Sequence, residues 1–281
     1  MATNKKKIEW KRIPIVIIIL AIVVVEVYPI FWMLSASFKQ SYEWTSKPAY
    51  ALNDGFYWQN YVDAWTRGNM ATFFKNSLIC TLVSLLFIVF FSVTVSFACT
   101  KMEWKLKEKT AKYFQLGIMI TITTSLMPLF QFYTKIGLIN TRWSLIVSYV
   151  AFGLSLSIFL MMGSLRTFPD DLMEAAVIDG CGIYKLMWYI MVPLMKNAIV
   201  TVLVLQFFFK WNDLLFSMTF ISDTSLKTVQ TGLLYFSDEF GNKNWGAIFA
   251  SVSMSIMPML VLYTALNKTV IEGMTAGAVK G

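Results

Sequence analysis

Residues 166–182 read RTFPDDLMEAAVIDGCG and stand between two long apolar stretches. Asp170 or Asp171 suits the N-cap of a helix, and Asp171 with Glu174 three residues later fits a capping box. Gly180 suits the position just past a helix end, because glycine adopts a left-handed backbone without strain. The segment is therefore predicted to form a short helix outside a lipid bilayer, between two membrane spans.

The predicted loop helix has an apolar stripe that something must cover. Its members recur at helical spacing and are Leu172, Met173, Ala176 and Val177. A second short helix is expected over Ile183–Met191, with Pro193 marking the entry to the next span. The stripe can lie on lipid headgroups, or it can dock in a groove on a soluble partner. Physical reasoning alone leaves both interpretations open.

Outward from this loop, six stretches are long and apolar enough to cross a bilayer, which needs about 20 helical residues. They are Ile13–Leu34, Leu78–Ala98, Tyr113–Phe132, Ser144–Met162, Ile199–Phe220 and Gly246–Leu266. The fifth is the least regular, because Lys210, Asn212 and Asp213 lie in its outer third. The whole chain of 281 residues is 57% apolar and only 14% charged, with a mean hydropathy of +0.61. The predicted fold class is an all-α polytopic membrane protein with six transmembrane helices.

The basic residues indicate the orientation of the chain. Lys and Arg gather in the N-terminal tail and in the short loop after the second span, which an even number of spans places on one side. Basic loops stay in the cytoplasm, so both termini are predicted to be cytoplasmic. The predicted parts are a tail 1–12, a transmembrane domain 13–266 that contains the loop 166–196, and a tail 267–281. The formal charge of +8 follows from this topology, so no nucleic-acid binding is expected.

Several kinds of chemical site are excluded by the residues present. The chain has no His, and its three Cys lack the CxxC spacing of a zinc site. No GxxxxGK[ST] loop occurs, so the chain is not expected to bind ATP phosphates itself. We expect no catalytic residues, no metal ligands and no cofactor in this chain, and we do not expect an enzyme.

The loop carries a motif that is specific in both spacing and position. Its residues are Glu174, Ala175, Ala176, Asp179, Gly180 and Pro193. This pattern before the penultimate span resembles the EAA loop of ABC-importer permeases. The tail Gly273–Gly281 also resembles the ending of a carbohydrate permease subunit. From about residue 29 to its end, the chain resembles the maltose-transporter type of permease, and within it the subunit with a short first outer loop.

This resemblance implies a type I ABC-importer permease fold, multi-pass in a bacterial cytoplasmic membrane. It implies four partners besides the lipid bilayer: a second homologous permease subunit, an ABC ATPase dimer that binds ATP and Mg, an external substrate-binding protein and a carbohydrate substrate. The chain would form half of the translocation pathway. The loop helix would sit in a cleft of the ATPase, where Glu174 can pair with a basic residue and Asp179 can fix the turn at Gly180.

The resemblance also implies contacts outside the loop. The family's C-terminal ending inserts between the ATPase subunits, which implies contacts by Thr275, Ala276, Gly277, Ala278, Lys280 and Gly281. The alternative for this tail is a disordered end. Possible contacts with the pathway or with a partner are Glu26, Trp211, Asn212, Asp238, Gly241 and Asn242. The last three are carried over by their position in an outer loop that reaches the binding protein's cleft in the family.

Glu26 lies near the middle of the first span, where a charge costs at least ~2.5–3.5 kcal/mol. It is expected to contact the partner permease or to line the pathway, unless the span is shifted in register.

Two other functions of the chain stay open. The solute could be another class, such as glycerol phosphate or a polyamine, or the chain could be a membrane-embedded sensor or enzyme. The sequence does not identify the sugar.

Overall fold

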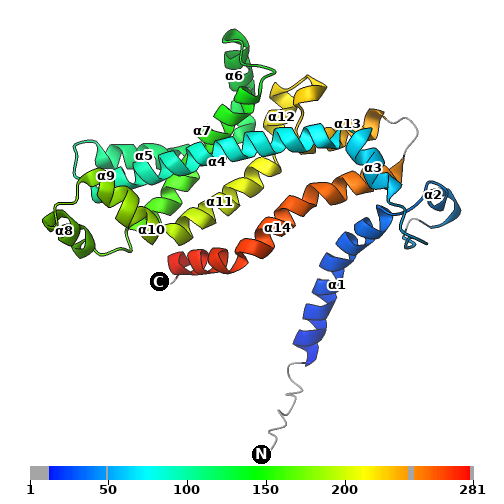
Figure 1. Ribbon diagram of the computed structural model, residues 1–281, viewed down its shortest axis with the longest axis horizontal. Helices are drawn as coiled ribbons and strands as arrows, with labels where there is room; N and C mark the ends of the chain where they lie inside the picture. Colours follow the sequence, from blue (N-terminus) through cyan, green and yellow to red (C-terminus); the bar gives the residue numbers. More distant parts are fainter. Residues whose placement is uncertain (1–12, 49, 240–243, 279–281) are drawn as a thin grey trace, which may run out of the picture. The chain divides into compact units, whose positions relative to one another are not determined.

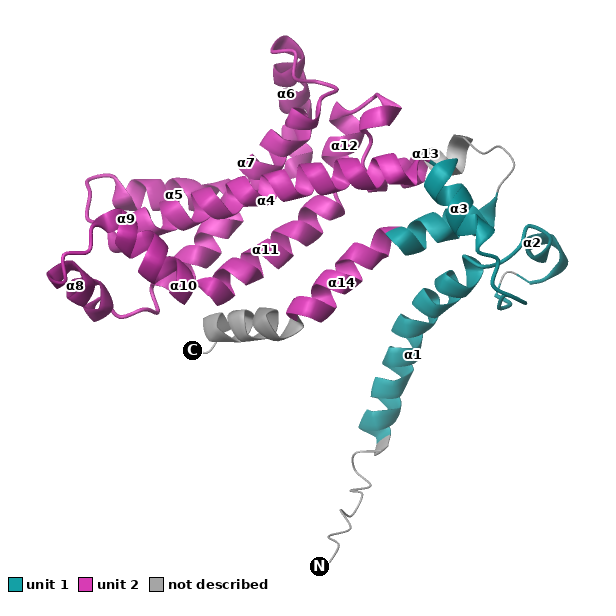
Figure 2. Cartoon of the chain, viewed as in Figure 1, with its two compact units in different colours: residues 1–68, 236–254 teal, residues 69–235, 255–281 magenta. Residues whose placement is uncertain are grey.

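The computed structural model describes residues 13–48, 50–239 and 244–278, and their regular structure is helical. Side chains are described for residues 14–48, 50–234 and 244–266. The chain divides into two compact units, one made of residues 1–68 and 236–254 and the other of residues 69–235 and 255–281 (Figure 2). The all-helical fold class predicted from the composition is confirmed.

The first unit joins a membrane-spanning helix to an ordered loop region. Its helices are α1 (Ile13–Ala36), α2 (Glu43–Ser46), α3 (Gln59–Thr66) and the beginning of α14 (Trp245–Ala278). Asn60 fixes the loop after α1, because its buried amide donates to the carbonyls of Ser37 (2.9 Å) and Lys39 (2.8 Å). The Lys39 ammonium lies 4.8 Å from the ring centre of Trp44, a cation–π contact that helps a buried charge to be tolerated.

The second unit is built around two long helices, α4 (Met70–Lys101) and α7 (Arg142–Leu165) (Figure 1). The other helices are α5 (Lys107–Gly117), α6 (Ile122–Lys135), α8 (Asp171–Ile178), α9 (Ile183–Lys185), η2 (Leu186–Met191), α10 (Val192–Leu194), α11 (Lys196–Trp211), α12 (Leu215–Phe220), η3 (Thr224–Leu226), α13 (Val229–Glu239) as far as Tyr235, and the rest of α14. Serines such as Ser84 and Ser148 are fully buried in α4 and α7. Small side chains let two helix backbones approach closely, which is the usual way that helices associate in lipid.

Four helices in the described part of the chain are long and apolar enough to span a membrane on their own. They cover Pro14–Ala36, Met70–Lys101, Arg142–Leu165 and Trp245–Leu266. Two bent pairs bring the number to six if each pair is one span. The pair α5 and α6 bends by 99°, and the segment Ile183–Leu194 bends by 74° against α11. Six spans are thus consistent with the structure.

The third and fifth expected spans are wrong as continuous helices. The stretch Tyr113–Phe132 is interrupted between Gly117 and Ile122, where Thr124 and Ser125 hydroxyls donate to the carbonyl of Thr121. The stretch Ile199–Phe220 breaks after Trp211, and α12 begins four residues later, at Leu215. Mean hydropathy over about 20 residues does not locate such breaks, because each stretch stays apolar on average even where polar residues such as Asn212 and Asp213 follow the break.

Candidate functional site

The loop helix α8 forms where the sequence predicts it, and it ends as predicted. Gly180 has φ +78°, a left-handed conformation that favours glycine. The Gly180 amide donates to the Val177 carbonyl and the Cys181 amide to the Ala176 carbonyl, both at 2.9 Å. These are the two hydrogen bonds of a Schellman motif, which satisfies carbonyls that the helix end leaves free.

The beginning of α8 differs from the prediction. Asp170 is the N-cap residue, but its side chain makes no capping hydrogen bond. Its Oδ1 instead accepts a bond of 2.6 Å from the Nζ of Lys101, the last residue of α4. Lys101 also donates to the Phe168 carbonyl at 2.8 Å, and only 5% of its side chain is exposed. The expected capping box is therefore replaced by an ion pair that ties α8 to a membrane-spanning helix.

The ion pair also affects the titration of the carboxyl group. The hydrogen bond from Lys101, and then its positive charge, hold the pKa of Asp170 below its ordinary value. Asp170 is exposed, so solvent screening limits what the pair contributes to stability. Its main effect is positional, because it fixes where α8 starts relative to α4.

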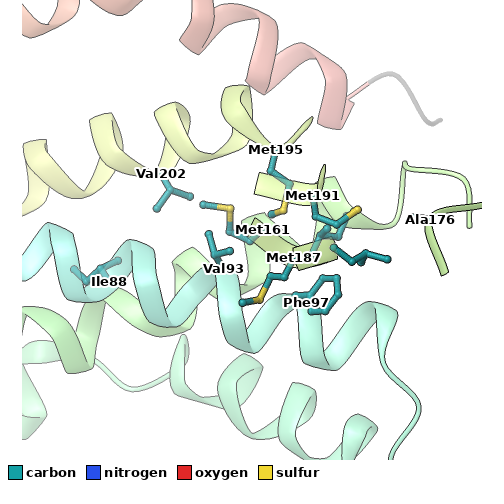
Figure 3. Packing of buried hydrophobic residues seen from close by; sticks show 11 residues of the cluster. Ile88, Val93, Phe97, Met161, Ala176, Met187, Met191, Met195 and Val202 are labelled. Carbon is teal, nitrogen blue, oxygen red and sulfur yellow. The ribbon is translucent and has the colours of Figure 1, made fainter. Parts of the chain in front are cut away.

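The predicted apolar stripe of α8 is split between two faces. Ala176 is buried and Met173 packs beside it against a cluster that includes Met161, Met187 and Met191 (Figure 3). Leu172, Val177 and Ile178 point outward instead, with exposed fractions of 45%, 61% and 85%. Glu174, Ala175 and Asp179 are exposed as well. The helix thus rests on one face against the body of the unit and presents a second, partly apolar face that the chain does not cover.

The segment after α8 also has one buried and one exposed side. The second helix predicted over Ile183–Met191 begins as α9 and continues as the π-helix η2, a rare form that frequently occurs at functional sites. Leu186, Met187 and Met191 are buried, whereas Tyr184 and Tyr189 are 77% and 80% exposed. Pro193 lies in α10, just before the bend into α11, so its predicted place at the entry to the span is confirmed.

Three of the predicted pathway or partner residues have described side chains. Glu26 is exposed on α1, and the structure gives it no hydrogen bond or ion pair with a described residue. Trp211 is buried, with its Nε1 donating to the Ser255 carbonyl at 2.9 Å and its ring stacked on Phe207. Asn212 is exposed at the end of α11 and bonds to the Phe208 carbonyl at 3.0 Å. Trp211 is thus placed in the packing between helices.

The remaining predicted sites lie at or beyond the limits of the described residues. Asp238 belongs to α13 and Thr275, Ala276, Gly277 and Ala278 to the end of α14, but their side chains are not described. Gly241, Asn242, Lys280 and Gly281 lie outside the described residues. The backbone through Ala278 is helical, so the part of the tail that is described continues helix α14 beyond the candidate span Trp245–Leu266.

One group of polar residues was missed as a site by sequence reasoning. Gln206, Lys210 and Asp213 line a cavity of about 280 Å³ together with residues of α7 and of the break between α5 and α6. Gln206 and Lys210 are buried. Their spacing of four and then three residues would have placed all three on one face of a helix. That signal was present in the sequence, where Lys210 and Asp213 only marked the fifth span as irregular and Gln206 was not singled out.

Comparison with known proteins gives consistent results along nearly the whole chain. The chain is 32% identical over 90% of its length to the melibiose/raffinose/stachyose import permease protein MelC of Bacillus subtilis, covering 91% of that protein. It is 31% identical over 90% of its length to the probable ABC transporter permease protein YurM of the same species, covering 84% of it. It is 29% identical over 96% of its length to the trehalose/maltose transport system permease protein MalG of Thermococcus litoralis, covering 98% of it.

The fold has a counterpart among solved structures. A chain in the crystal structure of a bacterial ABC transporter that imports the acidic polysaccharide alginate matches with a TM-score of 0.84. The match covers 95% of this chain and 99% of that chain, at 17% sequence identity, and so establishes the likeness of the fold. No protein-family model matches the chain.

Proposed function

This chain belongs to the permease subunits of carbohydrate ABC importers, and from that premise we propose that α8 is the element through which it is coupled to a separate ATPase. The protein is a multi-pass protein of the cytoplasmic membrane and a transport subunit rather than an enzyme. Its mechanical task is to convert a movement imposed from outside the bilayer into a rearrangement of membrane-spanning helices. The element that receives the movement must therefore be exposed on one face and firmly attached on the other.

The observation that carries the proposal is the two-faced packing of α8. Ile178 and Val177 are exposed beside Glu174, so the outer face combines apolar area with a carboxylate. Such a face suits a groove on a soluble partner that is apolar at its centre and carries a basic residue. On the inner face, Ala176 and the Lys101–Asp170 pair attach α8 to the membrane helices. A displacement of α8 would therefore be passed to α4.

Cross-linking tests this contact directly. In the assembled importer, a single cysteine at Ile178 should cross-link to the ATPase subunit, in a chain whose native cysteines are replaced. Met218 on α12 supplies the matched control, since it is also apolar and exposed (67%). A cross-link from Met218→Cys and none from Ile178→Cys would contradict the proposed contact. Replacement of Glu174 by Ala should reduce ATPase retention severalfold without lowering insertion of the chain in the membrane.

We further propose that α8 and both termini lie on the cytoplasmic side, because the basic residues gather there. Cys181 is partly exposed, whereas Cys80 and Cys99 are buried. A membrane-impermeant thiol reagent should therefore label Cys181 in inside-out vesicles and not in intact cells. A cysteine at the exposed Ser222 should show the opposite pattern. Labelling of Cys181 in intact cells would contradict this topology.

The proposed substrate is an oligosaccharide that an external binding protein delivers, and the second half of the pathway comes from a homologous permease. The printed names of the relatives MelC and MalG support this substrate class. The reconstituted complex should show sugar-stimulated ATP hydrolysis and uptake with one or more of maltose, trehalose, raffinose and diacetylchitobiose. Stimulation by glycerol phosphate or a polyamine, with none by sugars, would favour the alternative solutes.

The C-terminal residues are proposed as a second contact with the ATPase. Small residues such as Ala276, Gly277 and Ala278 allow close approach of two backbones. Deletion of residues 275–281 should lower sugar-stimulated ATP hydrolysis and weaken ATPase retention, with normal insertion in the membrane. Unchanged transport, hydrolysis and complex recovery after the deletion would indicate a tail without function.

A further inference from the structure

Polar side chains are buried on α11, which is part of a candidate membrane span, where they are costly unless something binds them. Gln206 is 2% exposed and Lys210 is 8% exposed. Ionisable residues within membrane spans almost always face a protein interior or a water-filled cavity, and they often mark a substrate pathway. Both residues line the cavity of about 280 Å³ described above.

The hydrogen bonds of Gln206 leave one atom unused. Its Nε2 donates to the Gly153 carbonyl (3.1 Å) and to the Ser157 hydroxyl (3.0 Å), both on α7. These bonds orient the amide. Its Oε1 is buried and has no hydrogen-bond partner among the described residues. A buried acceptor without a partner is rare in native proteins and costs about 1–3 kcal/mol, so it indicates a donor that is supplied from elsewhere.

The carboxylate of Asp213, in contrast, has its hydrogen-bond donors within the chain. Its carboxylate accepts from the Tyr149 hydroxyl at 2.9 Å and from the amides of Phe216 (3.2 Å) and Ser217 (3.1 Å). Lys210 lies with its ammonium 5.6 Å from the ring centre of Tyr149 and makes no ion pair within 4 Å with a described carboxylate. The cavity is therefore lined by a buried ammonium donor, Lys210, and by the side chain of Gln206, whose Oε1 is unpartnered among the described residues and closed to solvent.

The walls of the cavity add two further features. Both helix breaks contribute to it, the first through Ile118 and Ile120 and the second through Asp213. In membrane transporters, substrate sites are typically formed where spanning helices are discontinuous, because irregular backbone at that depth lines a cavity. Aromatic rings line the cavity as well, from Phe152 and Phe209 among others.

From these observations we propose that the cavity is a carbohydrate subsite within this subunit, which takes one neutral pyranose unit of the transported oligosaccharide. A sugar hydroxyl both donates and accepts, so one hydroxyl can accept from the Lys210 ammonium while a neighbouring hydroxyl meets the Gln206 side chain. The aromatic rings suit the apolar face of a pyranose. The volume lies just below the roughly 300–1,000 Å³ usual for small-molecule sites, which suits one ring rather than a whole oligosaccharide. The lining contains one cationic and one anionic side chain, so its formal charge favours a neutral sugar.

The inference rests on the proposed function as a carbohydrate importer, and the test reads occupancy of the cavity itself. Ile120 lines the cavity and is 57% exposed, so Ile120→Cys provides a reporter in a chain without its native cysteines. In the reconstituted importer, the reaction of this thiol with a small reagent is measured against increasing maltose, trehalose, raffinose and diacetylchitobiose. The sugar that the importer transports should protect the thiol, and a sugar that it does not transport should not.

Substitutions then assign the protection to the two polar residues. Lys210→Met keeps the length of the side chain but removes the ammonium, and should raise the half-protecting sugar concentration about tenfold, as expected for a hydrogen bond to a charged group. Gln206→Leu should raise it severalfold. Thr201→Val is the matched control, because Thr201 is a buried polar residue of α11 whose hydroxyl bonds to Asn197 and which does not line the cavity. It should leave the half-protecting concentration unchanged.

The outcomes separate the two proposals. If the unsubstituted importer takes up a sugar that never protects the cavity thiol, the subsite is wrong and the importer function stands. Protection that neither Lys210→Met nor Gln206→Leu changes would also overturn the assignment. If no sugar is taken up or stimulates ATP hydrolysis, the carbohydrate function fails, and the subsite fails with it. A variant that inserts poorly is replaced by Lys210→Arg, which keeps the donor and should restore protection.

Discussion

The loop helix α8 and the second half of α11 depart from ordinary burial in opposite ways. On α8 the apolar side chains of Val177 and Ile178 are exposed, whereas on α11 the polar side chains of Gln206 and Lys210 are buried. Each arrangement is unfavourable for the isolated chain. Exposed apolar area is relieved by a protein surface, and buried polar atoms are relieved by a polar solute. The difference indicates which region meets a macromolecular partner and which meets the transported molecule.

The largest effect is expected from a substitution at the end of α8, which should impair coupling to the ATPase but not sugar binding on α11. Gly180→Leu places a side chain at φ +78°, which costs a non-glycine residue roughly 1–2 kcal/mol and displaces the helix end. We expect sugar uptake and ATPase retention to fall roughly tenfold, while the sugar protection of the α11 cavity persists. Gly182→Ala is the control, because Gly182 has φ −70° and open space around it. Equal uptake by both variants would contradict a role for the α8 geometry.

A second substitution separates packing from binding on α11. Trp211 lies one residue after Lys210, but its indole bonds to the Ser255 carbonyl and it is buried among helices. Trp211→Phe removes that hydrogen bond and leaves a buried carbonyl, so the complex should lose roughly 1–3 kcal/mol of stability. The thermal unfolding midpoint should fall, and the half-protecting sugar concentration should stay the same. Trp143→Phe, at an exposed position, serves as the control. A change in sugar protection with no loss of stability would place Trp211 in the binding site.

The smallest effect is expected at the attachment of α8. Lys101→Met removes the ion pair with Asp170, and hydrogen exchange of the α8 amides should become faster by no more than a few-fold, since solvent screens the exposed Asp170 carboxylate. Lys107→Met is the control, because it breaks a similar ion pair with Glu103 that does not involve α8. Equal exchange of the α8 amides in both variants would show that the pair does not hold the helix.

The same pair predicts a pH dependence with a definite sign. The pKa of Asp170 is lowered in the folded chain, so its contribution is fully present above the ordinary value of about 3.9 and is lost only as the pH falls through the lowered pKa. The ratio of exchange rates between Lys101→Met and the unsubstituted chain should therefore be constant from about pH 8 to about pH 5. A ratio that falls toward one within that range would contradict the lowered pKa.

Much of α8 could be predicted from the sequence because its signals are local. The residue after the last helical turn must accept a positive φ, and Gly180 does so whatever surrounds it. The start of the helix could not be predicted in the same way. Asp170 has the chemistry of a cap, but Lys101 takes its carboxylate, and Lys101 is distant in the sequence. A carboxylate near the start of a helix can accept either from the first helix amides or from a side chain distant in the sequence. Only the fold shows which of these hydrogen bonds forms.

The faces of α8 and the cavity on α11 depended on tertiary structure for the same reason. Helical spacing grouped Met173 and Ala176 with Leu172 and Val177, yet only the first two meet the methionine cluster. On α11, the spacing of the polar residues could be seen in the sequence, but the residues that surround them in the fold could not. The free Oε1 of Gln206 becomes evident only because Gly153 and Ser157 engage the other end of the amide.

By itself, the sequence determined that this protein crosses a membrane in about six helical segments and carries one exposed loop helix ended by Gly180. Those properties follow from summed hydropathy and from single-residue backbone preferences, which act within a few residues along the chain. The tertiary structure alone decided where the third and fifth spans break, which face of α8 stays uncovered, and that Gln206 and Lys210 share a cavity. The uncovered face of α8 and the shared cavity depend on contacts between residues far apart in the sequence, because burial and hydrogen-bond satisfaction are properties of neighbours in space.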